Sequence, residues 1–128
     1  MSFIPVKSDN GAVLPWEYMP AAAAAYKAGQ LLDVADGKVK ATSGGTTTPP
    51  YLCMADVTAA EGEPIPVTRV SRECIYESEL NAEMDSAAPG VKASVATDGV
   101  SVASAAGTFE LVSVEGTKAG DRVRGRWV

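Results

Sequence analysis

Short runs of β-branched and small residues alternate with glycine-containing turns along most of this chain, and this alternation restricts its fold more than any other feature. Two Asp-Gly steps, at residues 36–37 and 98–99, each lie between runs of alternating apolar residues. Asp-Gly in that setting is a strong β-hairpin signal, because a tight two-residue turn needs positive φ at both positions. We therefore expect a chain that is mainly β.

The strands expected beyond residue 15 are short and regularly spaced. We count about eight or nine of them, which is typical of a small single-domain β-barrel or a two-sheet β fold. At most one or two short helical turns are expected, in the alanine-rich residues 21–25 and within 80–90, and an irregular connection is the alternative for the alanine run. The expected strands lie near residues 31–35, 38–42, 51–57, 65–70, 73–79, 93–96, 100–103, 109–115 and 122–128, with 16–19 compatible with one more.

The 128 residues divide into an extended N-terminal arm, residues 1–15, and a single β domain, residues 16–128. The arm mixes Pro, Asn, Gly and Ser with few apolar side chains, which is not a helical pattern. Two interpretations stay open for it. Either it is a frayed terminus, or Phe3, Ile4 and Pro5 dock onto a neighbouring subunit and become ordered only there.

Composition excludes several classes of function. The net charge of −5 argues against nucleic-acid binding, which needs cations to displace phosphate counterions. The chain has no histidine and no glycine-rich phosphate loop with a suitably spaced lysine. A serine or cysteine nucleophile needs a base, and no such pair is apparent. We therefore expect no enzymatic activity, no cofactor and no metal.

An acidic stretch follows Arg72, and it is the best remaining place for chemistry. Paired carboxylates can act as general acid and base or bind calcium. Carboxylates at alternate positions of a strand share one face, however, and a solvated face explains them equally well. A hydrolase site built from Glu77, Glu79 and Asp85 is thus a distant alternative. The stretch comprises Glu73, Glu77, Glu79, Glu83 and Asp85.

The last expected strand alternates three arginines with apolar or small residues, so that the arginines share one face. This face is either the outer side of a half-buried strand or a basic strip that pairs with the acidic stretch of a neighbouring copy, since guanidinium groups suit bidentate carboxylate contacts. Trp16 and Trp127 are expected to be core anchors, with an interface role as the alternative. The candidate interface residues are Phe3, Ile4, Pro5, Trp16, Arg122, Arg124 and Arg126.

The two cysteines, Cys53 and Cys74, each lie in a strand-like run, where a buried free thiol is more common than a disulfide. The first residues do not resemble a signal peptide, and no apolar run approaches the roughly 18 residues of a membrane span. We therefore expect free thiols in a soluble protein that is made in the cytosol and does not interact with membranes.

Segments spanning most of residues 26–128 carry a resemblance to a known family. "PYLCMADVTAAEGEPIPVTRV" and the closing "AGDRVRGRWV" resemble passages of the capsid cement, or head-decoration, proteins of tailed phages and prophages, including the phage lambda decoration protein family. The resemblance implies a β-tulip fold and a homotrimer on the capsid surface, bound to the major capsid protein after synthesis in the bacterial cytoplasm. It also implies an N-terminal arm that orders on the shell.

The arginine-rich final strand and the two cysteines depart from that family pattern, which leaves the trimer contacts undefined. Two alternatives remain for the function. The chain could be another phage structural component, such as a tail or fibre accessory module, or a generic β-barrel binding module. A trimer favours decoration, whereas a hexameric ring favours a tail tube or connector.

Overall fold

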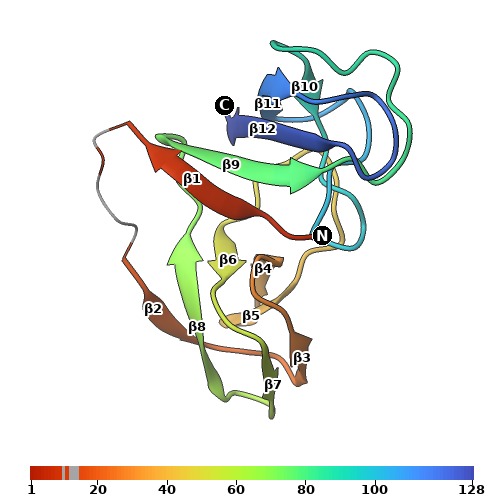
Figure 1. Cartoon of the computed structure of the whole chain (residues 1–128). Coiled ribbons are helices and arrows are strands. Elements are labelled where there is room, and N and C mark those ends of the chain that lie inside the picture. The colour runs from red at the N-terminus through yellow and green to blue at the C-terminus, as the bar shows by residue number, and fades with distance from the viewer. Residues whose placement is uncertain (10, 12–14) are drawn as a thin grey trace.

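A computed structural model describes residues 1–9, 11 and 15–128 (Figure 1). Within these residues the chain forms twelve β-strands and no helix, and every strand pair is antiparallel. Sheet A has the order β1 (Ile4–Ser8), β9 (Cys74–Glu79), β12 (Arg122–Trp127), β11 (Phe109–Val114) and β10 (Lys92–Ala93). Sheet B has the order β2 (Glu17–Pro20), β8 (Pro64–Arg69), β6 (Tyr51–Cys53), β4 (Leu31–Ala35) and β5 (Lys38–Ala41). A small third sheet pairs β3 (Ala24–Tyr26) with β7 (Val57–Ala59).

The mainly β prediction is confirmed, but the described sheets do not close into a barrel. Sheet B comes nearest to closure, because its two edges meet just beyond β2. Ala21 and Val39 form a parallel bridge there, and the Ala22 N–H donates to the Val39 carbonyl at 2.9 Å. Sheet B therefore curls around its own small core, while sheet A packs beside it.

The first Asp-Gly step forms the predicted hairpin. Asp36 and Gly37 have φ values of 53° and 74°, and Ala35 pairs with Lys38 across a two-residue turn between β4 and β5. The second step makes a longer loop, in which only Gly99 has positive φ and the Ala96 N–H donates to the Ser101 carbonyl at 2.9 Å. The same dipeptide thus adopts two different turns.

The alanine-rich segment forms β3 and no helical turn. Tyr26 explains this choice, because its ring is buried and its hydroxyl donates to the Ala22 carbonyl at 2.6 Å. Pairing with β7 gives hydrogen-bond partners to backbone groups of β3 that a short helix would have paired within itself.

Pro66 lies within the central strand β8, which pairs with β2 on one side and with β6 on the other. Its carbonyl accepts from the Met54 N–H at 3.0 Å, at the point where the ladder between β6 and β8 has ended with the Cys53–Val67 pair. The missing proline N–H thus removes no ladder bond. The strand predicted at residues 51–57 is divided in two, because β6 stops at Cys53 and β7 starts at Val57, where it pairs with β3 in the third sheet.

Two apolar cores share the strands of sheet B. Leu31 and Leu52 face sheet A and join the larger core, whereas their neighbours Leu32 and Cys53 face the interior of sheet B. Strands β4 and β6 therefore carry buried residues on both faces. The larger core is centred on four aromatic rings, Phe3, Tyr76, Phe109 and Trp127.

Residues 1–9 belong to the fold, and β1 within them is a strand of sheet A rather than part of a separate arm. Residues 10 and 12–14 of the expected arm lie outside the described residues. β1 pairs with β9 at the edge of sheet A (Figure 1). Phe3, just before β1, is only 1% exposed. The Phe3 ring meets the Phe109 ring edge-on at 5.6 Å and lies 5.5 Å from Trp127. Burial of this large aromatic ring accounts for the order of the segment.

Among the residues described, no helix has the length and apolar character that a membrane crossing requires.

Candidate protein-protein interface

The described residues contain no group of three or more His, Cys, Asp or Glu side chains that could hold a metal ion. Glu77 and Glu79 line a small surface depression with Arg122, but Asp85 is not part of it. Arg124 donates to Glu77 at 3.1 Å, so one of the two carboxylates already has a cationic partner. The geometry therefore gives the hydrolase alternative no assembled site.

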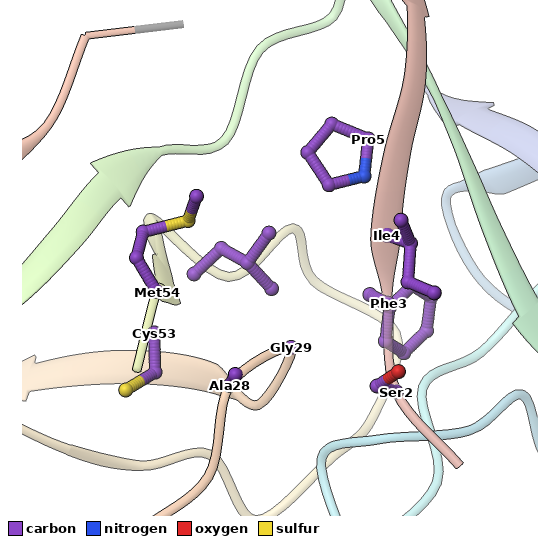
Figure 2. Close-up of a pocket in the computed structure, with 9 residues that line it drawn as sticks. Ser2, Phe3, Ile4, Pro5, Ala28, Gly29, Cys53 and Met54 are labelled. Carbon is purple, nitrogen blue, oxygen red and sulfur yellow. The ribbon is translucent and has the colours of Figure 1, made fainter. Parts of the chain in front are cut away.

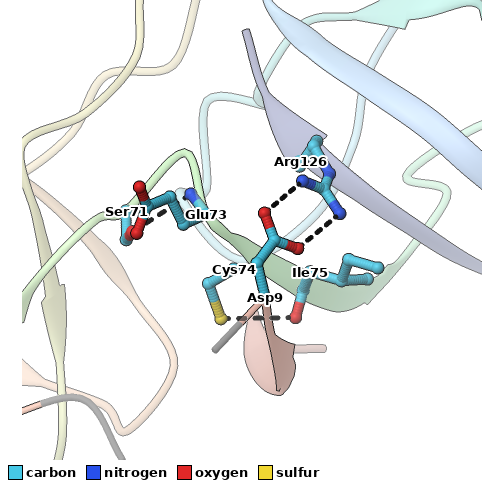
Figure 3. Close-up of polar contacts among 6 residues, drawn as sticks. All are labelled: Asp9, Ser71, Glu73, Cys74, Ile75 and Arg126. Atoms are coloured by element: carbon cyan, nitrogen blue, oxygen red, sulfur yellow. Dashed lines mark hydrogen bonds and ion pairs between the residues drawn. The ribbon is translucent and has the colours of Figure 1, made fainter. Parts of the chain in front are cut away.

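Arg122, Arg124 and Arg126 lie on the outer face of sheet A, and the carboxylates nearest to them belong to the same chain. Val123, Gly125 and Trp127 are buried on the opposite face, as the alternation predicts. Arg126 forms a bidentate pair with Asp9, at 3.1 and 3.2 Å, just after β1 (Figure 3). Arg122 lies opposite Glu79 in the β12–β9 register.

These arginines are thus distributed among carboxylates of β9 and the N-terminal segment, and they need no neighbouring copy to find an anionic group. Exposed pairs of this kind contribute little to stability, because solvent screens them. Their role at an interface stays a prediction.

Phe3, Ile4 and Pro5 lie in three different environments. Phe3 is inside the core of its own chain and has no surface to offer a neighbour. Ile4 is 49% exposed, and Pro5 is half-buried against an apolar cavity. Of the three, Ile4 is the best placed for contact with a partner.

Exposed large apolar side chains are concentrated at the N-terminal end of the chain. Five of the eight in the described residues lie within the first 18 positions, on or beside β1 and β2, which are edge strands of the two large sheets. Trp16 is 53% exposed, which contradicts a core role, and Tyr18 is 69% exposed. These five residues, which we call the N-terminal apolar group, are Met1, Ile4, Val6, Trp16 and Tyr18.

An apolar cavity of about 290 Å³ opens between β1 and sheet B (Figure 2). Pro5 and Ile4 border it on the β1 side, and Met54 and Leu52 border it on the sheet B side. Leu52 of β6 pairs with Thr68 of β8, and Tyr18 of β2 pairs with Pro66 of β8. Pro66 and Thr68 are two positions apart on β8. Side chains two apart on a strand share a face, so Tyr18 lies at the edge of the sheet face that forms the cavity floor.

Trp127 shows how completely the aromatic core is closed. Its indole N–H is buried and has no hydrogen-bond partner among the described residues. The Tyr76 ring packs against it edge-on at 5.0 Å, and the Tyr76 hydroxyl accepts from the Ser71 N–H at 3.0 Å. The core therefore encloses one unpaired polar N–H among its aromatic rings, while the Tyr76 hydroxyl is paired with the backbone.

Both cysteines are free and buried, as predicted. Burial raises the pKa of each thiol, so neither favours the reactive thiolate. Cys74 donates to the Ile75 carbonyl beside the Asp9–Arg126 pair (Figure 3). The thiols therefore act as small apolar groups in the two cores.

The buried hydroxyl of Tyr76 makes stability depend on alkaline pH. Burial raises the pKa of Tyr76 from 10.0 to about 12. The unfolded chain then loses this proton first, so the contribution of Tyr76 to stability is full below about pH 10 and is lost as pH rises toward 12, by about 1.4 kcal/mol per unit. The raised thiol pKa values act in the same direction.

Urea unfolding between pH 7 and pH 11 measures this slope, and Tyr76→Phe should flatten it. An unchanged slope in the variant contradicts the assignment to Tyr76.

Sequence reasoning identified Trp16 and Ile4 but missed Tyr18. The available signal was the Trp-x-Tyr spacing between Pro15 and Pro20, which places two aromatic rings on one face of a short strand.

No protein-family model matches this chain, and no curated protein matches it.

Proposed function

We propose that this chain is a head-decoration protein of a tailed phage or prophage, which binds the outer surface of an assembled capsid as an oligomer, with a trimer expected. One observation carries the proposal beyond the sequence resemblance. The N-terminal apolar group leaves five large side chains exposed on or beside two edge strands, whereas the described residues contain four ion pairs and no group of side chains that could hold a metal ion. Exposed apolar groups of this kind mark protein contact surfaces.

The proposed mechanism is stabilisation by mass action. A protein that binds the assembled lattice and not its dispersed subunits lowers the free energy of the lattice alone. Many copies on one shell add their contributions. We therefore expect the chain to co-sediment with expanded capsids of its own phage and to raise their melting temperature. Absence of both effects contradicts decoration, and a hexameric ring in solution favours a tail component.

Trp16, which adjoins β2, and Tyr18, which lies within it, are expected to contribute most to capsid binding. Trp and Tyr are frequent hot spots, so the double variant Trp16→Ala/Tyr18→Ala should weaken binding at least about tenfold, a loss of about 1.4 kcal/mol or more. Val34→Ala is the matched control, because Val34 is 45% exposed in the same sheet but outside the N-terminal apolar group. Co-sedimentation titration measures both. Equal binding by the two variants removes β2 from the interface.

A further inference from the structure

The two Asp-Gly steps of this chain differ in how their reacting groups are held. At the first step, Asp36 is exposed and has a positive φ of 53°. No other non-glycine residue in the described part of the chain has a positive φ. Its carboxylate has no hydrogen bond or ion pair within the described structure, and the Gly37 N–H makes no backbone hydrogen bond there. Nothing lies within 4 Å of the position that a Gly37 Cβ would occupy. Both groups are therefore free to move.

The second step is held at both groups. The Asp98 carboxylate accepts from the Val100 N–H at 2.9 Å and from the Ser101 hydroxyl at 2.8 Å, and Asn81 donates to it at 3.3 Å. The Gly99 N–H donates to the Ala96 carbonyl at 3.0 Å. Gly99 is also buried, with Thr42 and Leu31 close to it.

We propose that Asp36 is a site of spontaneous conversion to isoaspartate in the folded protein, and that the same dipeptide at Asp98 is protected. In this reaction the Gly37 nitrogen attacks Cγ of Asp36 and forms a C–N bond. The carboxyl C–O bond breaks, and the oxygen leaves with the amide proton and one further proton as water. A five-membered succinimide results. One water molecule then opens the ring, and attack at the main-chain carbonyl leaves the backbone running through Cβ.

The attack requires the carboxyl carbon and the following nitrogen to approach each other by rotation about the Asp side chain and backbone. At Asp98 that rotation must break the bonds from Val100, Ser101 and Asn81, together with the Gly99 bond to Ala96. At Asp36 neither the carboxylate nor the Gly37 N–H has such a bond to break. The barrier difference therefore comes from the hydrogen bonds and not from the residue types.

Isoaspartate at residue 36 adds one backbone atom to a turn that has room for two residues only. The pair Ala35–Lys38 would then lose its register, and the β4–β5 hairpin forms one edge of sheet B. The modification is therefore expected to loosen that edge while sheet A keeps its structure.

Incubation of the folded protein in oxygen-18-labelled water at neutral pH tests the proposal, because each succinimide that hydrolyses takes up one labelled oxygen. Tryptic peptides 28–38 and 93–118 separate the two sites. We expect uptake and isoaspartate at Asp36 to form at least about tenfold faster than at Asp98, which corresponds to a barrier difference of about 1.4 kcal/mol. The same incubation in urea should bring the two rates together. Equal rates in the folded protein, or a faster rate at Asp98, overturn the proposal.

Ser101→Ala tests the cause of the protection. Loss of this donor should raise the rate at Asp98 and leave the rate at Asp36 unchanged, provided that circular dichroism shows the variant to be folded. An unchanged Asp98 rate in the folded variant overturns the assignment of protection to these hydrogen bonds. Asn81→Ala removes a different donor to the same carboxylate and is the second variant, to be used if Ser101→Ala does not fold.

Discussion

Phe3→Ala is expected to destabilise the protein by about 3–5 kcal/mol, the usual cost of removing a buried phenylalanine ring. Phe3 packs against both Phe109 and Trp127, and its truncation leaves a cavity that the surrounding core can fill only in part. Urea unfolding followed by fluorescence measures the change.

Ile4→Ala is the matched control for Phe3→Ala, because Ile4 is the next residue and is half exposed. Its expected cost is below about 1 kcal/mol. Similar costs for the two variants contradict the placement of Phe3 in the core, and they restore the interpretation of residues 1–15 as an arm.

Gly29→Ala is expected to be the second most damaging change, because it breaks the connection between the N-terminal segment and sheet B. The Phe3 N–H donates to the Gly29 carbonyl at 2.9 Å, and the Gly29 N–H donates to the Cys53 carbonyl at 2.8 Å. A Cβ on Gly29 would lie 2.4 Å from Cβ of Ser2 and 3.0 Å from the Phe3 carbonyl oxygen. The N-terminal segment must therefore move, at an overpacking cost of about 1–3 kcal/mol.

Gly120→Ala separates this clash from backbone strain. The two glycines have φ values of 84° and 86°, but nothing lies within 4 Å of the Gly120 position. Both variants bear the cost of positive φ, about 1–2 kcal/mol, and only Gly29→Ala bears the clash as well. Equal free energies of unfolding for the two variants contradict the close packing of Ser2 and Phe3 against Gly29.

Local patterns predicted the strands with strict alternation. The outward arginines and inward Val123 and Trp127 of β12 could be read from spacing alone, because one face of a half-buried strand must be apolar. The Asp36-Gly37 hairpin was predictable for a similar reason, since its turn geometry depends on two adjacent residues.

Features that depend on distant contacts were not predictable. Phe3 is fixed by Phe109 and Trp127, more than 100 positions away in the chain, and a proline-containing terminus without such partners would be irregular. The alanine run became a strand because Tyr26 is buried and β7 offers a ladder. Pairing of this kind depends on the assembled fold rather than on local propensity.

The candidate interface was only partly predictable, because burial and exposure of an aromatic residue give the same alternating pattern. Trp16 and Trp127 both lie at the end of a strand-like run, yet one is 53% exposed and the other 1%. The difference lies in their surroundings. Trp127 is in β12 of sheet A and packs against Phe3, whereas Trp16 adjoins the edge strand β2.

The two faces of β4 and β6 determine how the whole chain loses its structure. Leu31 and Leu32 are adjacent in β4 but belong to different cores. Neither core can therefore unfold while β4 stays packed in the other. Leu52 and Cys53 couple the cores in the same way one strand over. Melting should therefore be cooperative, with both halves of the molecule sharing a single transition.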